Sequence, residues 1–340
     1  MSTPDMSTPP DDVMIRLDHA RKHYPGQATP AVEDLSLDIR AGEIVALLGP
    51  SGCGKTTTLR LINRLIEPTS GRIFINGRDA LTVDPDELRR HIGYVIQQVG
   101  LFPHMRIAEN VGIVPRALGW DKARISERVD ELLELVGLDP KVYRRRYPKN
   151  LSGGQQQRVG VARALAADPP VLLMDEPFGA LDPITRERLQ DELLVLQSRI
   201  GKTIVLVTHD VAEAVKVGDR IAMFAEQGRL AQYDTPAAIL AEPADEYVAS
   251  FVGSGAAIRR LRLETVGSVE LEPLQGSENA DDDSPVVRRD QTLYDALDAM
   301  LTARADHAVV LDADGRRVGT LTLTAVVRDE AAPDVPETAR

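Results

Sequence analysis

The chain has 340 residues, of which 43% are hydrophobic and 27% are charged, a composition typical of a globular protein with a buried core. The formal net charge of −12 argues against a nucleic-acid-binding protein, because no overall basic field would attract phosphates. No apolar run approaches the ~18 residues that a membrane-spanning helix needs, which argues against an integral membrane protein.

The length allows roughly two domains. Residues 1–12 are polar and rich in proline, so we expect them to be disordered rather than to form a signal peptide. The single cysteine, Cys53, cannot form a disulfide within the chain, which suits a reducing cytoplasm.

Residues 13–17 and 35–39 alternate apolar and polar side chains, as half-buried strands do. Tyr24 lies between them. It could stack on an adenine ring or pack on the sheet as a loop residue, and the residues alone favour the loop role.

Residues 49–57 match the G-x-x-x-x-G-K-[ST] phosphate loop without a mismatch. The apolar run 43–48 predicts a strand before the loop, and residues 58–63 predict a helix after it. Glycines let backbone N–H groups curl around a phosphate, and the helix N-terminus adds partial positive charge. A glycine-rich turn before a structural helix is the alternative, but a chance match is expected in about one chain in a hundred. The expected ATP-binding residues are Gly49, Pro50, Ser51, Gly52, Cys53 (as a small spacer), Gly54, Lys55 toward the β- and γ-phosphates, Thr56 toward Mg²⁺, and Thr57.

The next predicted elements are a strand over 72–77, a short helix over 86–90 and a strand over 91–96. This last strand ends at Gln97. A polar residue at the carboxyl end of a strand in an α/β sheet lies where ligands bind.

A helical insertion follows, with helices predicted over 108–119 and 122–136 and a stop at Gly137. The basic run 144–146 is interpreted as a solvated surface turn rather than a nucleic-acid site. Ser152 is an N-cap candidate for a helix over 156–167. The glycines at 153 and 154 could offer N–H groups to an anion, although plain helix capping would explain the pattern equally well.

Two further strands end in groups that can perform chemistry. The buried run 171–175 ends at Asp175 and Glu176, which can hold Mg²⁺ and orient or deprotonate a water; a solvated acidic turn is the alternative. Asp182 follows shortly after. The run 202–208 ends at His209, and its place at a strand end favours a phosphate contact over an ordinary core or surface histidine.

A second unit is predicted after about residue 252. Residues 257–269 are expected to pair as a strand, and the acidic residues 278–284 to form a linker. An amphipathic helix over 292–301 and two strands over 307–311 and 317–322, joined by a turn at 312–315, complete it. Such a small unit would be marginal alone, so we expect it to dock on a partner, most simply its copy in a second chain.

Taken together, these motifs resemble the ATPase subunit of an ABC transporter from about residue 15 to residue 252. They are intact and in the family's order: Walker A (49–56), the Q-loop Gln97, the signature (151–155), Walker B (171–175) with Glu176, the D-loop (180–182) and the switch histidine His209. The resemblance implies an α/β fold with a RecA-like parallel-sheet core, an antiparallel β subdomain and a helical subdomain over about 98–158. It also moves Tyr24 to the adenine-stacking position, in place of the loop role.

Residues 61–71, 94–104 and 114–120 look like the ATPases of osmoprotectant importers, which take up glycine betaine, carnitine, choline or proline betaine. Such subunits often end in a pair of CBS repeats. The implied domains are an ABC ATPase domain over 13–252, a linker with an eroded first repeat over 253–283, a CBS-like α+β unit over 284–328 and a disordered tail over 329–340.

The family mechanism implies an enzyme that hydrolyses ATP with Mg²⁺ between two copies of the chain. Glu176 would act as catalytic base and His209 would contact the γ-phosphate. Thr56, Gln97 and Asp175 would lie around the metal. The signature of one copy would face the ATP of the other; the signature residues are Ser152, Gly153, Gly154 and Gln155. Asp182 is the D-loop residue.

The implied partners are a second copy of the chain, integral membrane permease subunits and, indirectly, a periplasmic or extracellular solute-binding protein, with no nucleic acid. The expected location is the cytoplasmic face of the membrane. Three alternatives stay open: a non-transport ABC ATPase, an importer for another solute such as an amino acid, and a regulatory nucleotide-binding module.

Overall fold

The computed structural model describes residues 12–97, 100–179, 181–273 and 284–327. The predicted disorder at residues 1–11 and 329–340 and most of the acidic linker therefore lie outside the described residues, as does Ala180 of the D-loop. The chain divides into two compact units, Met1–Val252 and Gly253–Arg340.

A six-stranded sheet, ordered β10-β9-β3-β8-β7-β6, forms the centre of the first unit. All neighbouring pairs are parallel except β9 and β10. The three neighbouring strands β3, β8 and β7 are buried along their whole length and mostly apolar, as parallel strands covered on both faces must be. Its strands are β3 (Ile44–Leu48), β6 (Ile92–Val95), β7 (Val171–Asp175), β8 (Thr203–Thr208), β9 (Arg220–Phe224) and β10 (Leu230–Asp234).

The predicted strand–loop–helix around the phosphate loop is present, but the helix starts earlier than expected. The helix α1 (Lys55–Ile62) begins within the loop, at Lys55 rather than at residue 58. Gly54 precedes it with φ 108°, which an L-residue rarely adopts. Lys55, Thr56 and Thr57 therefore lie in the first turn of the helix, where backbone N–H groups are not used by the helix itself.

The first unit contains a second, antiparallel sheet in the order β2-β1-β4-β5. Its alternating burial matches the alternation of the sequence: on β2, Val32, Leu35, Leu37 and Ile39 are buried. These side chains share one core with Val45, Leu47 and Leu59 of the phosphate-loop region. The strands are β1 (Val13–Lys22), β2 (Val32–Arg40), β4 (Ser70–Ile75) and β5 (Arg78–Asp79).

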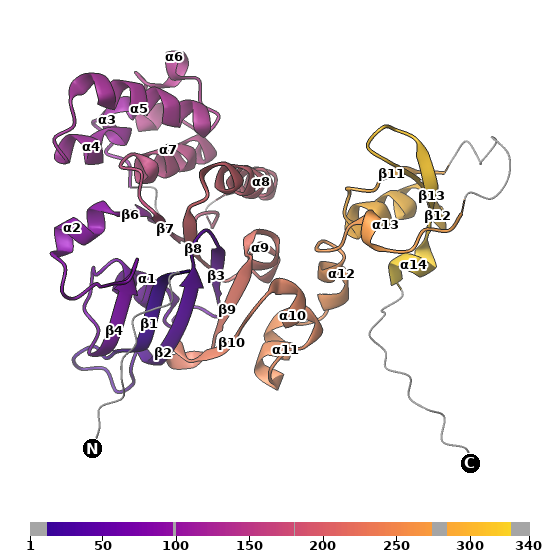
Figure 1. The fold of residues 1–340 in the computed structure, drawn as a ribbon, viewed down its shortest axis with the longest axis horizontal. Helices are drawn as coiled ribbons and strands as arrows, with labels where there is room; N and C mark the ends of the chain where they lie inside the picture. Colours follow the sequence, from indigo (N-terminus) through magenta and orange to yellow (C-terminus); the bar gives the residue numbers. More distant parts are fainter. Residues whose placement is uncertain (1–11, 98–99, 180, 274–283, 328–340) are drawn as a thin grey trace. The chain divides into compact units, whose positions relative to one another are not determined.

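Figure 1 shows α3 to α7 gathered in a helical layer at the end of the first unit that lies opposite β1, β2 and β4. The predicted helix over 108–119 is divided into α3 and α4 at Gly112, because Pro115 has no N–H to continue the helical hydrogen bonds. The helices of this layer are α3 (Ile107–Val111), α4 (Ile113–Ala117), α5 (Lys122–Leu135), α6 (Pro140–Tyr143), a 3-10 turn (Pro148–Asn150) and α7 (Gly153–Leu165).

The remaining helices of the first unit connect or flank the strands. Asp182 caps α8 by accepting a hydrogen bond from the backbone N–H of Thr185, and Asp210 caps α9 in the same way. The elements are α2 (Pro85–Arg90), α8 (Pro183–Ile200), α9 (Val211–Val217), a 3-10 turn (Glu226–Gly228), α10 (Pro236–Ala241) and α11 (Glu246–Val252).

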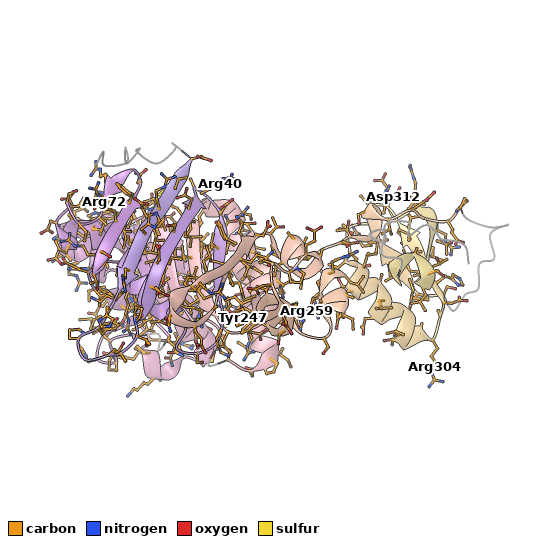
Figure 2. All side chains as sticks on the ribbon, turned by 90° about the horizontal axis from the view of Figure 1, so that it is seen from below. Arg40, Arg72, Tyr247, Arg259, Arg304 and Asp312 are labelled. Atoms are coloured by element: carbon orange, nitrogen blue, oxygen red, sulfur yellow. The ribbon has the colours of Figure 1, made fainter. Side chains whose placement is uncertain are left out.

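The second unit has a three-stranded sheet, ordered β11-β12-β13, with β12 and β13 forming the predicted hairpin. Its small core includes Val266, Val287, Leu293, Met300 and Leu321. Figure 2 shows Arg304, which ends α13 with φ 54°, extending from the surface. The elements are α12 (Ala256–Arg260), a 3-10 turn (Val266–Ser268), β11 (Val286–Arg288), α13 (Leu293–Ala303), β12 (His307–Leu311), β13 (Arg317–Thr322) and α14 (Leu323–Val327).

The prediction of a strand over 257–269 was wrong. This segment forms α12, a turn and a short 3-10 helix, and its only described pairing is one isolated bridge between Thr265 and Thr292. Gly255, with φ 94°, starts α12, and an i,i+4 ion pair between Arg260 and Glu264 follows helical rather than strand spacing. The apolar residues of the segment nevertheless reach the core, through Val266.

Replacing Gly93 of β6 with Ala is expected to destabilise the first unit by about 1–3 kcal/mol. A Cβ atom there would lie 2.6 Å from Cδ1 of Leu172 and 2.7 Å from the backbone oxygen of Ala164, which cannot move without shifting α7. Chemical denaturation measures the change. Gly153→Ala is the control, since its Cβ meets nothing closer than 3.7 Å; equal stability of the two variants would contradict the packing argument.

Candidate active site

The strand order brings the predicted site residues together. The strands β3, β8, β7 and β6 are parallel neighbours, so their carboxyl ends lie at one edge of the sheet. The phosphate loop follows β3, His209 follows β8, and Gln97 follows β6. Asp175 is the last residue of β7, and Glu176 comes directly after it. This edge is where ligands bind in α/β folds.

The phosphate loop approaches neighbouring backbone too closely to carry side chains at two of its glycines. A Cβ atom on Gly49 would lie 2.4 Å from the carbonyl oxygen of Phe224, and one on Gly54 would lie 2.5 Å from that of Ala31. Cys53 is buried between them, and burial raises the pKa of its thiol. The structure thus supports the interpretation of Cys53 as a small spacer.

Lys55 lies inside the loop rather than on the surface. Only 5% of it is exposed, and its ammonium donates hydrogen bonds to the carbonyl oxygens of Gly49 and Pro50, both at 2.7 Å. The charge is therefore held at the centre of the curled backbone. A phosphate in the loop would meet this ammonium together with the N–H groups of the first turn of α1.

Thr56 and Asp175 meet across the sheet edge. The Thr56 hydroxyl donates to a carboxylate oxygen of Asp175 at 2.9 Å. Burial raises the pKa of Asp175 above its usual range, although the hydrogen bond from Thr56 opposes this rise. A hydroxyl and a buried carboxylate are oxygen donors that fit Mg²⁺, which takes one or two protein ligands and completes its shell with water and phosphate oxygens.

Glu176 lies beside two other predicted site residues, Gln97 and the second predicted catalytic residue, His209. Its Oε2 accepts a hydrogen bond from Nε2 of Gln97 at 2.9 Å, and its Oε1 lies 3.6 Å from Nδ1 of His209. Glu176 has φ 46°, a backbone conformation that is uncommon for non-glycine residues and that occurs most often at functional sites. Gln97 thus contacts Glu176, whereas Thr56 and Asp175 contact each other.

The signature forms the N-terminus of α7, which starts at Gly153 rather than at the predicted residue 156. The Ser152 hydroxyl accepts from the backbone N–H of Gln155 at 3.3 Å, and the Gln155 side chain accepts from that of Ser152 at 3.0 Å. This capping box leaves Ser152 and Gly153 exposed. No hydrogen bond or ion pair between described residues joins the signature to the phosphate loop of the same chain.

The remaining predicted residues lie on three different segments of the first unit. Tyr24 is half-buried after β1, with the Lys22 ammonium 5.2 Å from its ring centroid. Ser51 and Gly52 are exposed on the loop, and Thr57 is half-buried on α1. Asp182 accepts from Thr185 at the start of α8, and this hydrogen bond lowers the pKa of its carboxyl.

Sequence reasoning missed two charged residues near the site. Glu213 is buried on α9, and Arg186 of α8 lies 3.8 Å from Asp210. The available signal for Glu213 was an acidic residue on the otherwise apolar face of a short helix.

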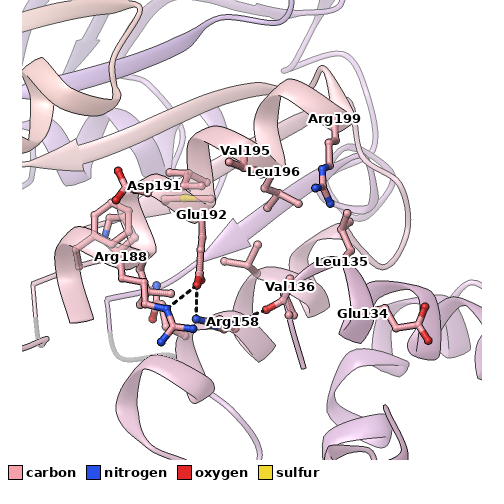
Figure 3. Close-up of a pocket in the computed structure, with 18 residues that line it drawn as sticks. Glu134, Leu135, Val136, Arg158, Arg188, Asp191, Glu192, Val195, Leu196 and Arg199 are labelled. Carbon is pink, nitrogen blue, oxygen red and sulfur yellow. Dashed lines mark hydrogen bonds and ion pairs between the residues drawn. The ribbon is translucent and has the colours of Figure 1, made fainter. Parts of the chain in front are cut away.

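A separate cavity of about 390 Å³ lies behind β7, between α5, α7 and α8 (Figure 3). Its lining includes Met174, Pro177 and Phe178, which flank Asp175 and Glu176 in the sequence. Figure 3 shows Arg158 and Arg188 both turned toward Glu192, and each forms an ion pair with its carboxylate. All three residues line the cavity. The cavity is mostly apolar and includes no residue of the phosphate loop, so it is not the nucleotide site.

Comparison with known proteins identifies the family. A family model described as "ABC transporter" matches residues 32–179. The osmoprotectant import ATP-binding protein OsmV of Salmonella typhimurium is 50% identical over 310 residues, which cover 90% of this chain and 78% of that protein. The chain belongs to the ABC transporter ATP-binding subunits. It is thus an ATPase that drives transport, and its fold is that of the ABC ATPases, as predicted.

Other relatives differ in how much of this subunit they match. The glycine betaine/carnitine/choline transport ATP-binding protein OpuCA of Bacillus subtilis is 50% identical over 300 residues, 88% of this chain and 76% of that protein. The spermidine/putrescine import ATP-binding protein PotA of Rubrobacter xylanophilus is 49% identical over 241 residues, 71% of this chain and 62% of that protein.

A solved structure gives the assembly of a related cassette. The ATP-binding cassette MJ0796, determined as a dimer in a post-hydrolysis state with ADP and Pi, has a TM-score of 0.59 and 36% identity, and covers 66% of this chain and 99% of that one. Within the described ranges, every helix of the present subunit is too short or too polar to span a bilayer.

Proposed function

We propose that this subunit hydrolyses ATP to energise an importer of quaternary-amine osmoprotectants such as glycine betaine, choline and carnitine. The number of residues that each relative matches supports the assignment of the cargo. The osmoprotectant relatives match 300 and 310 residues, more than the 252 residues of the first unit, so their likeness extends into the second. The polyamine relative matches only 241 residues at nearly the same identity.

The contacts at the sheet edge support a role for each residue. Lys55 and the N–H groups of the loop would bind the phosphates, while Thr56 and Asp175 would hold Mg²⁺. Bound there, the metal would supply positive charge that offsets the charge developing on the phosphate oxygens. Glu176, oriented by Gln97, would accept the proton of the attacking water, and His209 beside it would contact the γ-phosphate.

The signature is proposed to act on a second copy of the subunit. It is exposed at the N-terminus of a 13-residue helix, where partial positive charge attracts an anion. The dimeric assembly of MJ0796 supports the same arrangement here. Tyr24 would stack on the adenine, and Asp182 would lie at the contact between the two copies.

We further propose that the subunit works at the cytoplasmic face of the membrane, against permease subunits that receive solute from a binding protein. The helical layer α3–α7 and Gln97 would form the docking side. The second unit is proposed to contain a CBS-like repeat over residues 284–328, with residues 253–283 as a linker and remnant of a first repeat.

Uptake of radiolabelled solutes tests the cargo. In cells that carry Lys55→Ala as their only copy, accumulation of glycine betaine, choline or carnitine at high salt is expected to be lost, because the variant removes the charge at the centre of the phosphate loop. Spermidine uptake is the control and should persist. Loss of spermidine uptake alone would favour a polyamine importer, and unchanged uptake of every solute would favour a non-transport ATPase.

A further inference from the structure

The Gln155 side chain makes a hydrogen bond from each side of its amide group. Its Oε1 accepts from the backbone N–H of Ser152 at 3.0 Å, which closes the capping box of α7. Its Nε2 donates to the hydroxyl oxygen of Tyr143, also at 3.0 Å. Turning the amide over would place its NH2 group against the N–H of Ser152, so both bonds require the same orientation. The cap of the signature helix is therefore joined to a residue outside the signature.

Tyr143, the last residue of α6, is held by contacts that do not involve Gln155. The guanidinium of Arg146 lies over its ring, 4.9 Å from the centroid. The backbone N–H of Arg146 donates to the Tyr143 carbonyl oxygen at 2.9 Å, and the N–H of Tyr143 donates to the carbonyl oxygen of Asp139 at 2.9 Å. Because Tyr143 is only half-buried, water could solvate its hydroxyl. The bond to Gln155 thus orients the amide rather than satisfying a buried group.

The three arginines after α6 fasten this segment to two other helices. Arg144 forms an ion pair with Asp130 of α5 at 2.7 Å. The carbonyl oxygens of Arg144 and Arg146 accept hydrogen bonds from the N–H groups of the first two residues of α3, at 3.0 and 2.9 Å. Arg145 and Arg146 are exposed. The basic run is therefore a support within the helical layer as well as the surface turn that the sequence predicted.

The order of the signature depends on its cap. The first turn of α7 has N–H groups that the helix does not use, and Ser152 and Gly153 are exposed, so little packing holds this turn. The other bond of the capping box, from the Gln155 N–H to the Ser152 hydroxyl, is longer, at 3.3 Å. If the Gln155 amide turned to water, only this bond would remain. Donors held in place before a phosphate arrives stabilise its charge better than donors that must first be ordered.

We propose that Tyr143 is a positioning residue for ATP hydrolysis between two chains: by accepting a hydrogen bond from Gln155 it fixes the capping box, and so orders the N–H groups that the signature presents to the ATP of the second copy. This inference rests on the proposed role of the signature. It assigns Tyr143 no contact with ATP.

The test uses purified full-length protein that carries Tyr143→Phe, which keeps the ring and removes only the hydroxyl. The kcat for ATP hydrolysis is expected to fall by about 2- to 10-fold, the range that one hydrogen bond contributes to an equilibrium. ATP binding to the monomer, measured by nucleotide titration at low protein concentration, should change by less than about twofold because the phosphate loop is untouched.

Tyr147→Phe is the matched control. Tyr147 is also half-buried, and the guanidinium of Arg106 lies 5.9 Å from its ring centroid. Its hydroxyl makes no hydrogen bond to any residue that the structure describes, so the same chemical change removes no contact. The control should keep the wild-type kcat, and thermal unfolding checks that both variants are folded.

Two further measurements separate positioning of the signature from a general structural role. In the Glu176→Gln background, Tyr143→Phe should raise the Kd of the ATP-dependent dimer by about 2- to 10-fold, as measured by sedimentation. Added to Gln155→Leu, Tyr143→Phe should lower kcat no further, since both changes remove the same contact.

A folded Tyr143→Phe variant with wild-type kcat and dimer affinity would overturn the inference. Losses of kcat that multiply in the double variant, or an equal loss in Tyr147→Phe, would overturn it as well. Activity that survives Lys55→Ala, or the absence of an ATP-dependent dimer in Glu176→Gln alone, would instead overturn the proposed function.

Discussion

Replacing Glu176 with Gln is expected to abolish ATP turnover while ATP binding persists. Gln still has an oxygen to accept the hydrogen bond from Gln97, so the local geometry is kept, but an amide cannot accept a proton from water. Loss of a general base lowers kcat by about 100- to 10,000-fold. Steady-state phosphate release measures the turnover, and nucleotide titration measures the binding.

The same variant is expected to trap a dimer. If ATP joins two copies and hydrolysis releases them, a variant that binds without hydrolysing should stay paired. Gel filtration with ATP and Mg²⁺ should show the dimer, and Glu176→Gln combined with Lys55→Ala should restore the monomer. A variant that binds ATP but elutes only as a monomer would contradict the sandwich arrangement.

Replacing Gly153 with Asp is expected to lower ATPase activity by at least about 100-fold, comparable to the loss of one oxyanion-stabilising group. Gly153 is exposed, and the nearest atom to a Cβ there is 3.7 Å away, so a Cβ atom is accommodated without disturbing α7. The carboxylate would repel a phosphate brought to the helix N-terminus by a second copy. Gly153→Ala, which adds no charge, is the matched variant and should lose much less activity.

Mixing two inactive variants tests whether the signature acts between chains. Gly153→Asp keeps its phosphate loop and Lys55→Ala keeps its signature, so a mixed dimer contains one intact composite site. We expect the mixture to regain part of the activity that each variant lacks alone. A mixture as inactive as its parts, although mixed dimers form, would show that each site is completed within one chain.

Much of the site was predictable because its motifs depend on local order along the chain. A phosphate loop needs a strand before it, glycines within it and a helix after it, and residues 43–63 carry all three. The prediction erred at helix starts: α1 and α7 begin earlier than expected, since their first turns are made of loop-like residues. It also assigned a strand to residues 257–269, where helical spacing and Gly255 favour turns.

The contacts of Glu213 and Arg186 could not be predicted from the sequence. An acidic residue on a short helix is usually solvated, and only the packing of α9 against its neighbours buries this one. The cavity behind β7 is equally a product of packing, because its lining comes from α5, α7, β7 and α8.

By itself, the sequence determined the phosphate loop, the polar residue at the end of each strand and the capped signature helix, since each follows from residues adjacent in the chain. Only the tertiary structure decided which strand ends are neighbours. Parallel strands are joined by long crossover connections, which allow the sheet order β3-β8-β7-β6 to differ from the chain order. That order brings Thr56 to Asp175 across 119 positions of sequence and places Glu176 between Gln97 and His209.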